Sequence, residues 1–308
     1  MIEVRELTKT YADDVGIKGV SFSVRPGEVT GFLGPNGAGK STTMRLILGL
    51  GRASSGTATV NGRPYTGHPA PLREAGGMLD ASAFHPGRKA IDHLRLLART
   101  HGIPRSRAAA VLEEVGLESA AHRRPGGFSL GMRQRFGLAA ALLGDPGVLI
   151  LDEPFNGLDP EGARWMRRML RRFAEQGRTV LLSSHLLSEM EDLADRVVLI
   201  ARGRILAETT TQEFIESAGG RNAARVVASD AEALCEVVER SGGTCARTGA
   251  NAVDVAGIDR LTIERLASAK GIEIYDFVPQ RTSLEEAFMK LTRTESEYRG
   301  TEAGGDRR

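Results

Sequence analysis

Apolar and polar residues alternate along the start of the chain, from residue 1 to about residue 33, as in the segment 20–24, with a turn at Pro26-Gly27. Alternation of this kind is typical of strands that are buried on one face only. We therefore expect an antiparallel layer of strands at the start of the chain. A further strand is expected over 57–60, before a turn at Asn61-Gly62.

From about residue 90 to residue 144 the pattern becomes helical, because apolar residues recur three or four positions apart. Three strongly apolar runs then follow, at 148–151, 179–183 and 196–200, and a helix is predicted over 162–176. Strands that alternate with helices indicate a largely parallel sheet, which binds its ligands at the carboxyl ends of the strands. The pattern thus predicts an α/β fold with a helical subdomain over about 90–144.

The composition changes after about residue 217, where shorter elements are predicted. In the order β-α-β-β-α-β, these elements are 224–228, 231–240, 244–247, 252–256, 260–269 and 272–278. That order matches the ferredoxin-like arrangement, and an amphipathic helix over 284–291 follows it. We expect a first domain over 1–218, a small α+β domain over 219–292, and a disordered polar tail over 293–308.

Composition and charge restrict the classes of function. The formal net charge of +2 over 308 residues is too small to indicate a nucleic-acid partner. The two cysteines, Cys235 and Cys245, lack metal-ligand spacing, so we expect a cytosolic protein with reduced thiols. The longest apolar runs are far shorter than a membrane span. If the protein serves a membrane process, we expect it to be a peripheral subunit.

A glycine-rich segment follows the apolar run at 29–33 and precedes a helical pattern. It consists of Gly34, Pro35, Asn36, Gly37, Ala38, Gly39, Lys40, Ser41 and Thr42. This is the phosphate-binding spacing G-x-x-x-x-G-K-[ST] between a strand and a helix. Glycines leave backbone N–H groups free to point at phosphate oxygens, and the helix directs its positive end at the same anion. The sequence therefore predicts a nucleoside triphosphate site, rather than a glycine turn that fits by chance.

Ionisable side chains near this segment suggest the chemistry. Lys40 would place its charge beside the β and γ phosphates, and the Ser41 hydroxyl would contact Mg²⁺. Asp152 and Glu153 end the apolar run at 148–151, where Asp152 suits Mg²⁺ through a water and Glu153 can polarise the attacking water. His185 ends the next run and can bond the γ-phosphate. The alternatives are an ordinary acidic surface pair and a structural histidine.

A second segment, residues 128–135, contains a turn of small residues just ahead of a helix that runs to about residue 143. Ser129 would cap this helix, and its free N–H groups would form another anion site. Taken alone, the segment is equally compatible with an ordinary capped helix.

Taken together and in this order, these motifs resemble the ATP-binding cassette (ABC) ATPases over residues 1 to about 215. The resemblance implies a P-loop ATPase that works as a homodimer, in which Ser129 and Gly131 contact the γ-phosphate of the ATP held by the other subunit. The turn at Gly157-Leu158-Asp159 would connect the two sites. Tyr11 falls where the family has an aromatic residue that stacks on adenine, although packing in the core is an equal alternative.

The chain departs from the family pattern at two places. The signature is usually L-S-G-G-Q, whereas here residues 128–132 are F-S-L-G-M. The family's glutamine, which links Mg²⁺ to the membrane partner, should lie near 77–80, where Asp80 occupies the position. Asp80 could approach Mg²⁺ through water, but it adds negative charge near the triphosphate.

Segments 79–86, 128–135 and 283–288 also resemble bacterial drug and antibiotic exporter ATPases of the daunorubicin and bacitracin resistance type. That resemblance implies an ATP-hydrolysing subunit on the cytoplasmic face of the membrane, with a separate permease as partner. Two alternatives remain open: an ABC ATPase that acts on nucleic acid or the ribosome, and an ATP-gated regulatory module. A P-loop GTPase is disfavoured because the chain has no N-K-x-D motif.

Overall fold

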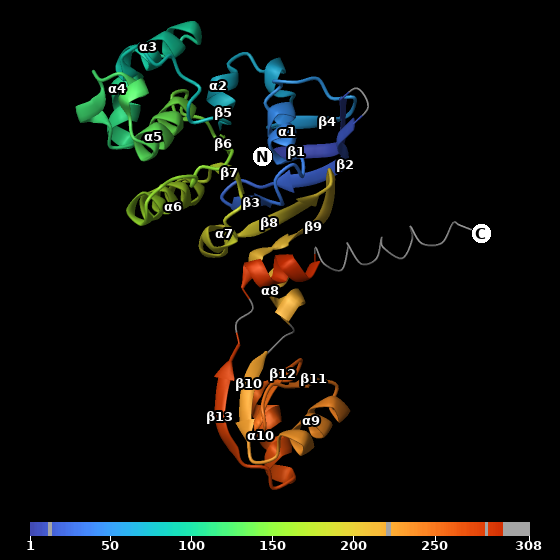
Figure 1. The fold of residues 1–308 in the computed structure, drawn as a ribbon. Helices are drawn as coiled ribbons and strands as arrows, with labels where there is room; N and C mark the ends of the chain where they lie inside the picture. Colours follow the sequence, from blue (N-terminus) through green and yellow to red (C-terminus); the bar gives the residue numbers. More distant parts are fainter. Residues whose placement is uncertain (12–13, 220–222, 281–282, 292–308) are drawn as a thin grey trace. The chain divides into compact units, whose positions relative to one another are not determined.

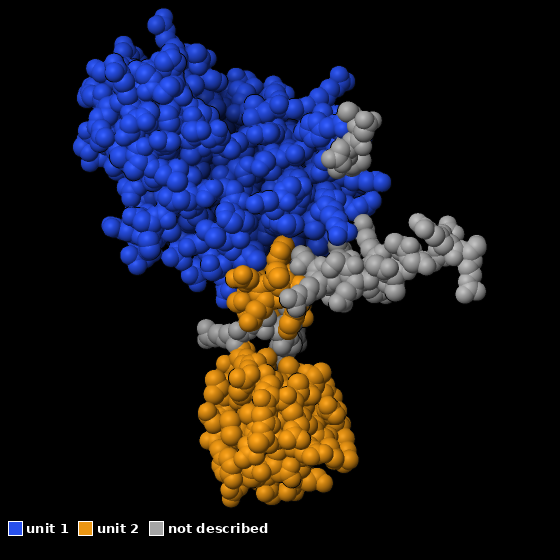
Figure 2. Space-filling model, in the orientation of Figure 1, with its two compact units in different colours: residues 1–209 blue, residues 210–308 orange. Residues whose placement is uncertain are grey.

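The computed structural model describes residues 1–11, 14–219, 223–280 and 283–291. The chain divides into two compact units, residues 1–209 and 210–308, which Figure 2 draws in blue and orange. The division falls before α8 (Thr211–Gly219), whereas the change of composition places the boundary near the end of that helix, at residue 218. The tail predicted over 293–308 lies outside the described residues.

The first unit begins with the expected antiparallel layer. It has three strands, β1 (Ile2–Tyr11), β2 (Asp14–Val24) and β4 (Ser55–Val60), in the order β2-β1-β4. Apolar side chains of β1 and β2 are buried in one core with residues of the main sheet. Phe22 of this layer stacks on Phe32 of the main sheet, with ring centroids 5.1 Å apart.

The main sheet of the first unit has six strands in the order β5-β6-β7-β3-β8-β9. These strands are β3 (Val29–Leu33), β5 (Ala75–Met78), β6 (Val148–Leu151), β7 (Thr179–Ser184), β8 (Arg196–Ala201) and β9 (Arg204–Thr210). The pairs β5-β6, β6-β7, β7-β3 and β3-β8 are parallel, as predicted. Every residue of β3, β6 and β7 is buried. Burial on both faces explains why these strands are unbroken apolar runs in the sequence.

Helices surround this sheet, and α3, α4 and α5 gather into the predicted helical segment, drawn in green in Figure 1. The helices of the unit are α1 (Lys40–Ile47), α2 (Pro71–Glu74), α3 (Ala90–Thr100), α4 (Ser106–Glu114), α5 (Leu130–Ala141), α6 (Pro160–Glu175) and α7 (Leu187–Leu193). Helix α6 begins two residues before the prediction. Asp159 Oδ1 accepts a hydrogen bond from Gly162 N at 2.7 Å, and proline follows this cap at the first helical position.

The second unit contains the predicted ferredoxin-like arrangement. Its elements are β10 (Ala224–Ala228), α9 (Ala231–Arg240), β11 (Thr244–Arg247), β12 (Ala252–Ala256), α10 (Arg260–Ala269) and β13 (Ile274–Pro279). The antiparallel strand order is β11-β12-β10-β13, and inward residues of the strands share one apolar core with α9 and α10. Asp230 and Asp259 cap the two helices. Residues 284–291 are helical, as the pattern predicts.

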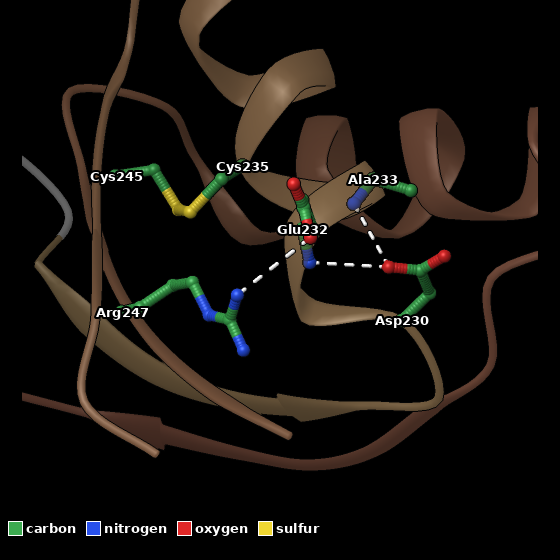
Figure 3. The surroundings of a disulfide bond; sticks show 6 residues. All are labelled: Asp230, Glu232, Ala233, Cys235, Cys245 and Arg247. Carbon is green, nitrogen blue, oxygen red and sulfur yellow. Dashed lines mark hydrogen bonds and ion pairs between the residues drawn. A yellow bond between two sulfur atoms is a disulfide. The ribbon is translucent and has the colours of Figure 1, made fainter. Parts of the chain in front are cut away.

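The expectation of two reduced cysteines is wrong in this structure, because Cys235 of α9 and Cys245 of β11 form a disulfide. Figure 3 shows the bond crossing from the helix to the strand, close to Arg247 and Glu232, whose charged groups lie 3.7 Å apart. The spacing of ten residues gave no sign of this pairing. It arises because the chain turns back after α9 and lays the edge strand β11 against that helix.

Within the described residues, the helices are all too short or too polar to cross a bilayer.

The disulfide closes a short loop around the turn between α9 and β11, so its loss should mainly raise the entropy of the unfolded chain. For a loop of this length the expected loss is about 2–3 kcal/mol in the free energy of unfolding. Hydrogen exchange on the full chain, with and without a thiol reductant, should give faster exchange across residues 224–279 when reduced. A double variant, Cys235→Ser with Cys245→Ser, should exchange at the reduced rate under both conditions. Equal protection of the oxidised and reduced protein would contradict this prediction.

Candidate functional site

The pocket at the glycine-rich segment lies where β3 ends and α1 begins, and its volume is about 310 Å³. It is lined by Gly16, Asn36, Gly37, Ala38, Gly39, Lys40, Ser41, Thr42, Leu79, Asp152 and Glu153. Two of its glycines have positive φ angles, +80° at Gly37 and +109° at Gly39. At Gly34, a Cβ atom would lie 2.1 Å from the carbonyl oxygen of Ile200. The loop conformation therefore depends on glycine at these positions.

The register of the parallel strands brings the predicted groups to one edge of the sheet. Leu33 of β3 is paired with Ser184 of β7, and Leu151 of β6 is paired with Leu182 of β7. The phosphate loop, the carboxylate pair and the end of β7 therefore begin at nearly the same level. This is the carboxyl edge, where parallel sheets bind ligands.

Lys40 is buried beneath the loop and has only 6% of its surface exposed. Its Nζ donates to the carbonyl oxygens of Gly34, at 2.6 Å, and Pro35, at 3.3 Å, and lies 4.0 Å from Glu153 Oε1. Burial lowers the pKa of Lys40, and the negative charges of Glu153 and Asp152 act against that shift. The carbonyl groups thus hold the ammonium at the floor of the pocket, where a phosphate oxygen could replace them as its partner.

Ser183, at the end of β7, holds the two carboxylate residues in place. Its hydroxyl donates to Asp152 Oδ1 and accepts from the backbone N of Glu153 at 3.0 Å. Asp152 N in turn donates to the carbonyl of Met78 on β5 at 2.8 Å. Glu153 has a φ of +51°, which is unusual for a residue with a side chain. These bonds turn the chain sharply at the strand end, so both carboxylates line the phosphate-loop pocket.

The side chains of Glu153 and His185 are hydrogen-bonded to each other. His185 Nδ1 lies 2.7 Å from Glu153 Oε2, and the backbone N of His185 donates to the same oxygen at 3.3 Å. An ionised carboxylate only accepts hydrogen bonds, so Nδ1 carries the proton in this contact. The other carboxylate oxygen, Oε1, is the one nearest to Lys40. The histidine side chain is 43% exposed.

Ser129 and Gly131 do not line this pocket. Ser129 is exposed at the start of α5, and its Oγ accepts a hydrogen bond from Met132 N at 3.3 Å, which confirms the predicted cap. The helix therefore presents its N-terminal end and the serine to the surface rather than to the phosphate loop of its own chain. The predicted contact of these residues with phosphate therefore requires a second molecule.

Asp80 lies beside the phosphate-loop pocket and does not line it. The Asp80 carboxylate accepts from Ser82 N at 2.7 Å and Ser82 Oγ at 2.6 Å, and these bonds hold its pKa below the usual value. Asp80 lines a neighbouring cavity of about 320 Å³, which shares Leu79 and the two carboxylates with the first.

Tyr11 is 52% exposed, which rules out the alternative of core packing. Its ring lies beside Gly16, where an added Cβ would come within 2.9 Å of the tyrosine Cε2 atom. Gly16 in turn lines the phosphate-loop pocket, whereas Tyr11 does not.

The residues at the pocket fit Mg²⁺. Ser41 and Asp152 both line it and offer a hydroxyl and a carboxylate, the oxygen ligands that Mg²⁺ prefers. Within the described residues, His, Cys, Asp and Glu side chains form no group of three placed to hold a metal ion. Mg²⁺ that is shared with phosphates needs only one or two protein ligands, so this donor set is sufficient.

Sequence reasoning missed the roles of Ser183, Gly16 and Gln134. Ser183 comes beside the carboxylate pair because of the register between β6 and β7. That register cannot be read from the sequence of either strand alone. Gly16 comes to the pocket only through the fold of the N-terminal layer. Gln134 is buried in α5 and donates a hydrogen bond to the carbonyl of Asn156, but it stands between Arg133 and Arg135 in the sequence, so no local pattern marked it as buried.

The chain is similar in sequence to known proteins. A family model described as ABC transporter matches residues 17–156. The daunorubicin/doxorubicin resistance ATP-binding protein DrrA of Streptomyces peucetius is 35% identical over 318 residues, which cover 99% of this chain and 96% of that protein. The bacitracin transport ATP-binding protein BcrA of Bacillus licheniformis is 41% identical over 211 residues, which cover 68% of this chain and 69% of that protein.

Among solved structures, one described as the ATP-binding subunit of an ABC transporter covers 70% of this chain and 92% of its own, with 30% identity and a TM-score of 0.64. The range matched by the family model, residues 17–156, includes the phosphate loop, the carboxylate strand and the helical segment between them. The chain therefore belongs to the ABC transporter family, as an ATP-binding subunit that hydrolyses ATP.

Proposed function

We propose that two copies of this chain drive a separate membrane permease, which exports a drug, an antibiotic or another small amphipathic compound. The subunit would work at the cytoplasmic face of the membrane without spanning it. The names of two relatives, which refer to bacitracin and to daunorubicin, support this substrate class. One observation carries the proposal: Lys40 and the carboxylate pair line one pocket, where His185 is hydrogen-bonded to Glu153, while Ser129 is exposed and does not line it.

The phosphate loop would bind the triphosphate of ATP. Backbone N–H groups of the loop and the start of α1 form an anion site, and Lys40 adds a full positive charge. Lys40 Nζ is now bonded to two carbonyl oxygens, which are weaker partners for an ammonium than a phosphate oxygen. Tyr11 would cover the adenine at the edge of the pocket.

Glu153 would polarise the water that attacks the γ-phosphate. Its bond to His185 fixes the carboxylate through Oε2, and Oε1 faces the pocket beside Lys40. The remaining nitrogen of His185 would bond the γ-phosphate, so the histidine would respond to its presence. Ser41 and Asp152 would hold Mg²⁺, which offsets the negative charge of the phosphates when bound. Asp80, now bonded to Ser82, would approach this ion only through water.

Ser129 and Gly131 would complete the ATP site of the other copy in a homodimer. The exposed serine and the free N–H groups of α5 form an anion site that the chain's own phosphate loop does not use. ATP between the two copies would favour the closed dimer through its higher affinity for that state. Hydrolysis and product release would reopen it, and the permease would convert this motion into transport.

Glu153→Gln should keep the shape of the site but remove the base. We expect hydrolysis to fall by about 10²–10⁴-fold, because general-base catalysis contributes this much. ATP should still bind, so size-exclusion chromatography with ATP and Mg²⁺ should detect a stable dimer. The matched control is Glu175→Gln, at an exposed position near the end of α6. A fully active Glu153→Gln protein that stays monomeric would overturn the proposed role.

Lys40→Ala should weaken ATP binding, because it removes charge-assisted bonds worth about 1.5–3 kcal/mol. The dissociation constant should rise by about 10- to 100-fold, which a titration with a fluorescent ATP analogue would measure. Lys270→Ala, at an exposed position in the second unit, is the control for loss of one lysine. Equal affinity of the Lys40→Ala and Lys270→Ala proteins would exclude the phosphate contact.

A further inference from the structure

One face of α5 packs against the segment that follows the carboxylate pair. Leu130, Gln134 and Gly137 are spaced four and three residues apart, so they lie on the same side of the helix. A Cβ added to Gly157 would lie 1.9 Å from Leu130 Cδ2, and one added to Gly137 would lie 2.7 Å from Met78 Sδ. The helix is therefore in close contact with the segment after the carboxylate pair at Leu130, and with the end of β5 at Gly137.

Gln134 makes the polar contact at the centre of this face. Its side chain is buried, with 5% of the residue exposed, and Nε2 donates to the carbonyl oxygen of Asn156 at 3.2 Å. The backbone N of Asn156 donates in turn to the carbonyl oxygen of Glu153 at 3.1 Å. Two hydrogen bonds therefore connect the middle of α5 to the residue that is proposed to activate water.

The other end of the Gln134 amide is open to a cavity. Its Oε1 is buried and has no hydrogen-bond partner among the described residues. Gln134 lines the cavity of about 320 Å³ together with Asp152, Glu153 and Asn156. A buried amide oxygen without a partner is unfavourable, and a cavity that is polar and this large has room for water. An apolar residue of similar size would avoid that penalty but could not donate a hydrogen bond to Asn156. The contact with Asn156 therefore explains why this position is a glutamine.

We infer that Gln134 is a positioning residue, which fixes the Ser129 end of α5 relative to Glu153 of the same chain. The inference rests on the proposed homodimer, in which Ser129 meets the ATP of the other copy while Glu153 serves its own. Closure on the ATP of one site would then move α5, and Gln134 would pass this movement to the carboxylate of the other site. The residue would couple the two sites without touching either nucleotide.

The test is Gln134→Met in the full chain, because methionine has a similar volume and cannot donate to Asn156. Gln134 does not line the phosphate-loop pocket, so ATP affinity should stay within about twofold of the unchanged protein. The turnover number should fall about 5- to 30-fold, the effect expected of 1–2 kcal/mol. The Hill coefficient of hydrolysis against ATP concentration should drop toward unity. A merely structural defect would reduce binding as well and would leave cooperativity unchanged.

Two further variants make the result decisive. Leu138→Met is the control, since this fully buried residue lies one turn further along α5 and the swap conserves volume. Leu130→Ala removes the apolar contact with Gly157 from a side chain that is 48% exposed, so the protein should fold even if Gln134→Met does not. Its Hill coefficient should also fall while its ATP affinity stays unchanged.

Unchanged turnover and cooperativity in both Gln134→Met and Leu130→Ala would refute the inference, as would a parallel loss of ATP affinity. A failure of the proposed homodimer looks different. In that case the unchanged protein itself would hydrolyse ATP without cooperativity, and the inference would fail with it.

Discussion

The site depends on the register of three parallel strands. Because β3, β6 and β7 end at nearly the same level, the phosphate loop, the carboxylate pair and His185 all emerge at one edge of the sheet. A shift of one residue between β6 and β7 would separate the Ser183 hydroxyl from its two partners, the Asp152 carboxylate and the backbone N of Glu153. The register is secured by burial, since each of these strands is covered on both faces and a slip would disturb the whole core.

The charged groups at this edge already have partners before any nucleotide binds. The buried ammonium of Lys40 has two carbonyl partners and a carboxylate nearby, and Glu153 is divided between Lys40 and His185. An incoming triphosphate would therefore exchange existing bonds for stronger ones instead of filling a bare charged cavity. Helix α5 makes none of these contacts. Ser129 at its start is exposed, and Gln134 in its middle donates a hydrogen bond to the carbonyl of Asn156, three residues after Glu153.

Much of the fold could be predicted from the sequence, because its patterns are local. The conformation of the loop before Lys40 is determined largely by its glycines, which can be recognised in the sequence. The unbroken apolar runs of β6 and β7 reflect burial on both faces. The order of short elements in the second unit was sufficient to predict its ferredoxin-like arrangement. The start of α6 was misplaced by two residues, because the capping role of Asp159 was not recognised.

Features that depend on contacts between distant segments could not be predicted. The Cys235–Cys245 disulfide depends on the packing of α9 against β11, and neither cysteine lies in a local sequence pattern that indicates pairing. The contact of Ser183 with the carboxylate pair depends on the pairing of β7 with β6. The contact of Gln134 depends on the packing of α5 against the turn at Asn156. The sequence marked Ser129 as a helix cap, and the family resemblance implied a contact with the ATP of another subunit; in the structure Ser129 does not line the pocket of its own chain.

The central claim is that ATP is bound between the phosphate loop of one copy and the α5 end of another. The most direct measurement is a crystal structure of the full chain with Mg²⁺ and a non-hydrolysable ATP analogue. The account predicts a two-fold dimer in which Ser129 Oγ of one copy lies within hydrogen-bonding distance of the γ-phosphate held by Lys40 of the other. A nucleotide bound by one copy alone, with Ser129 facing solvent in every assembly of the crystal, would contradict it.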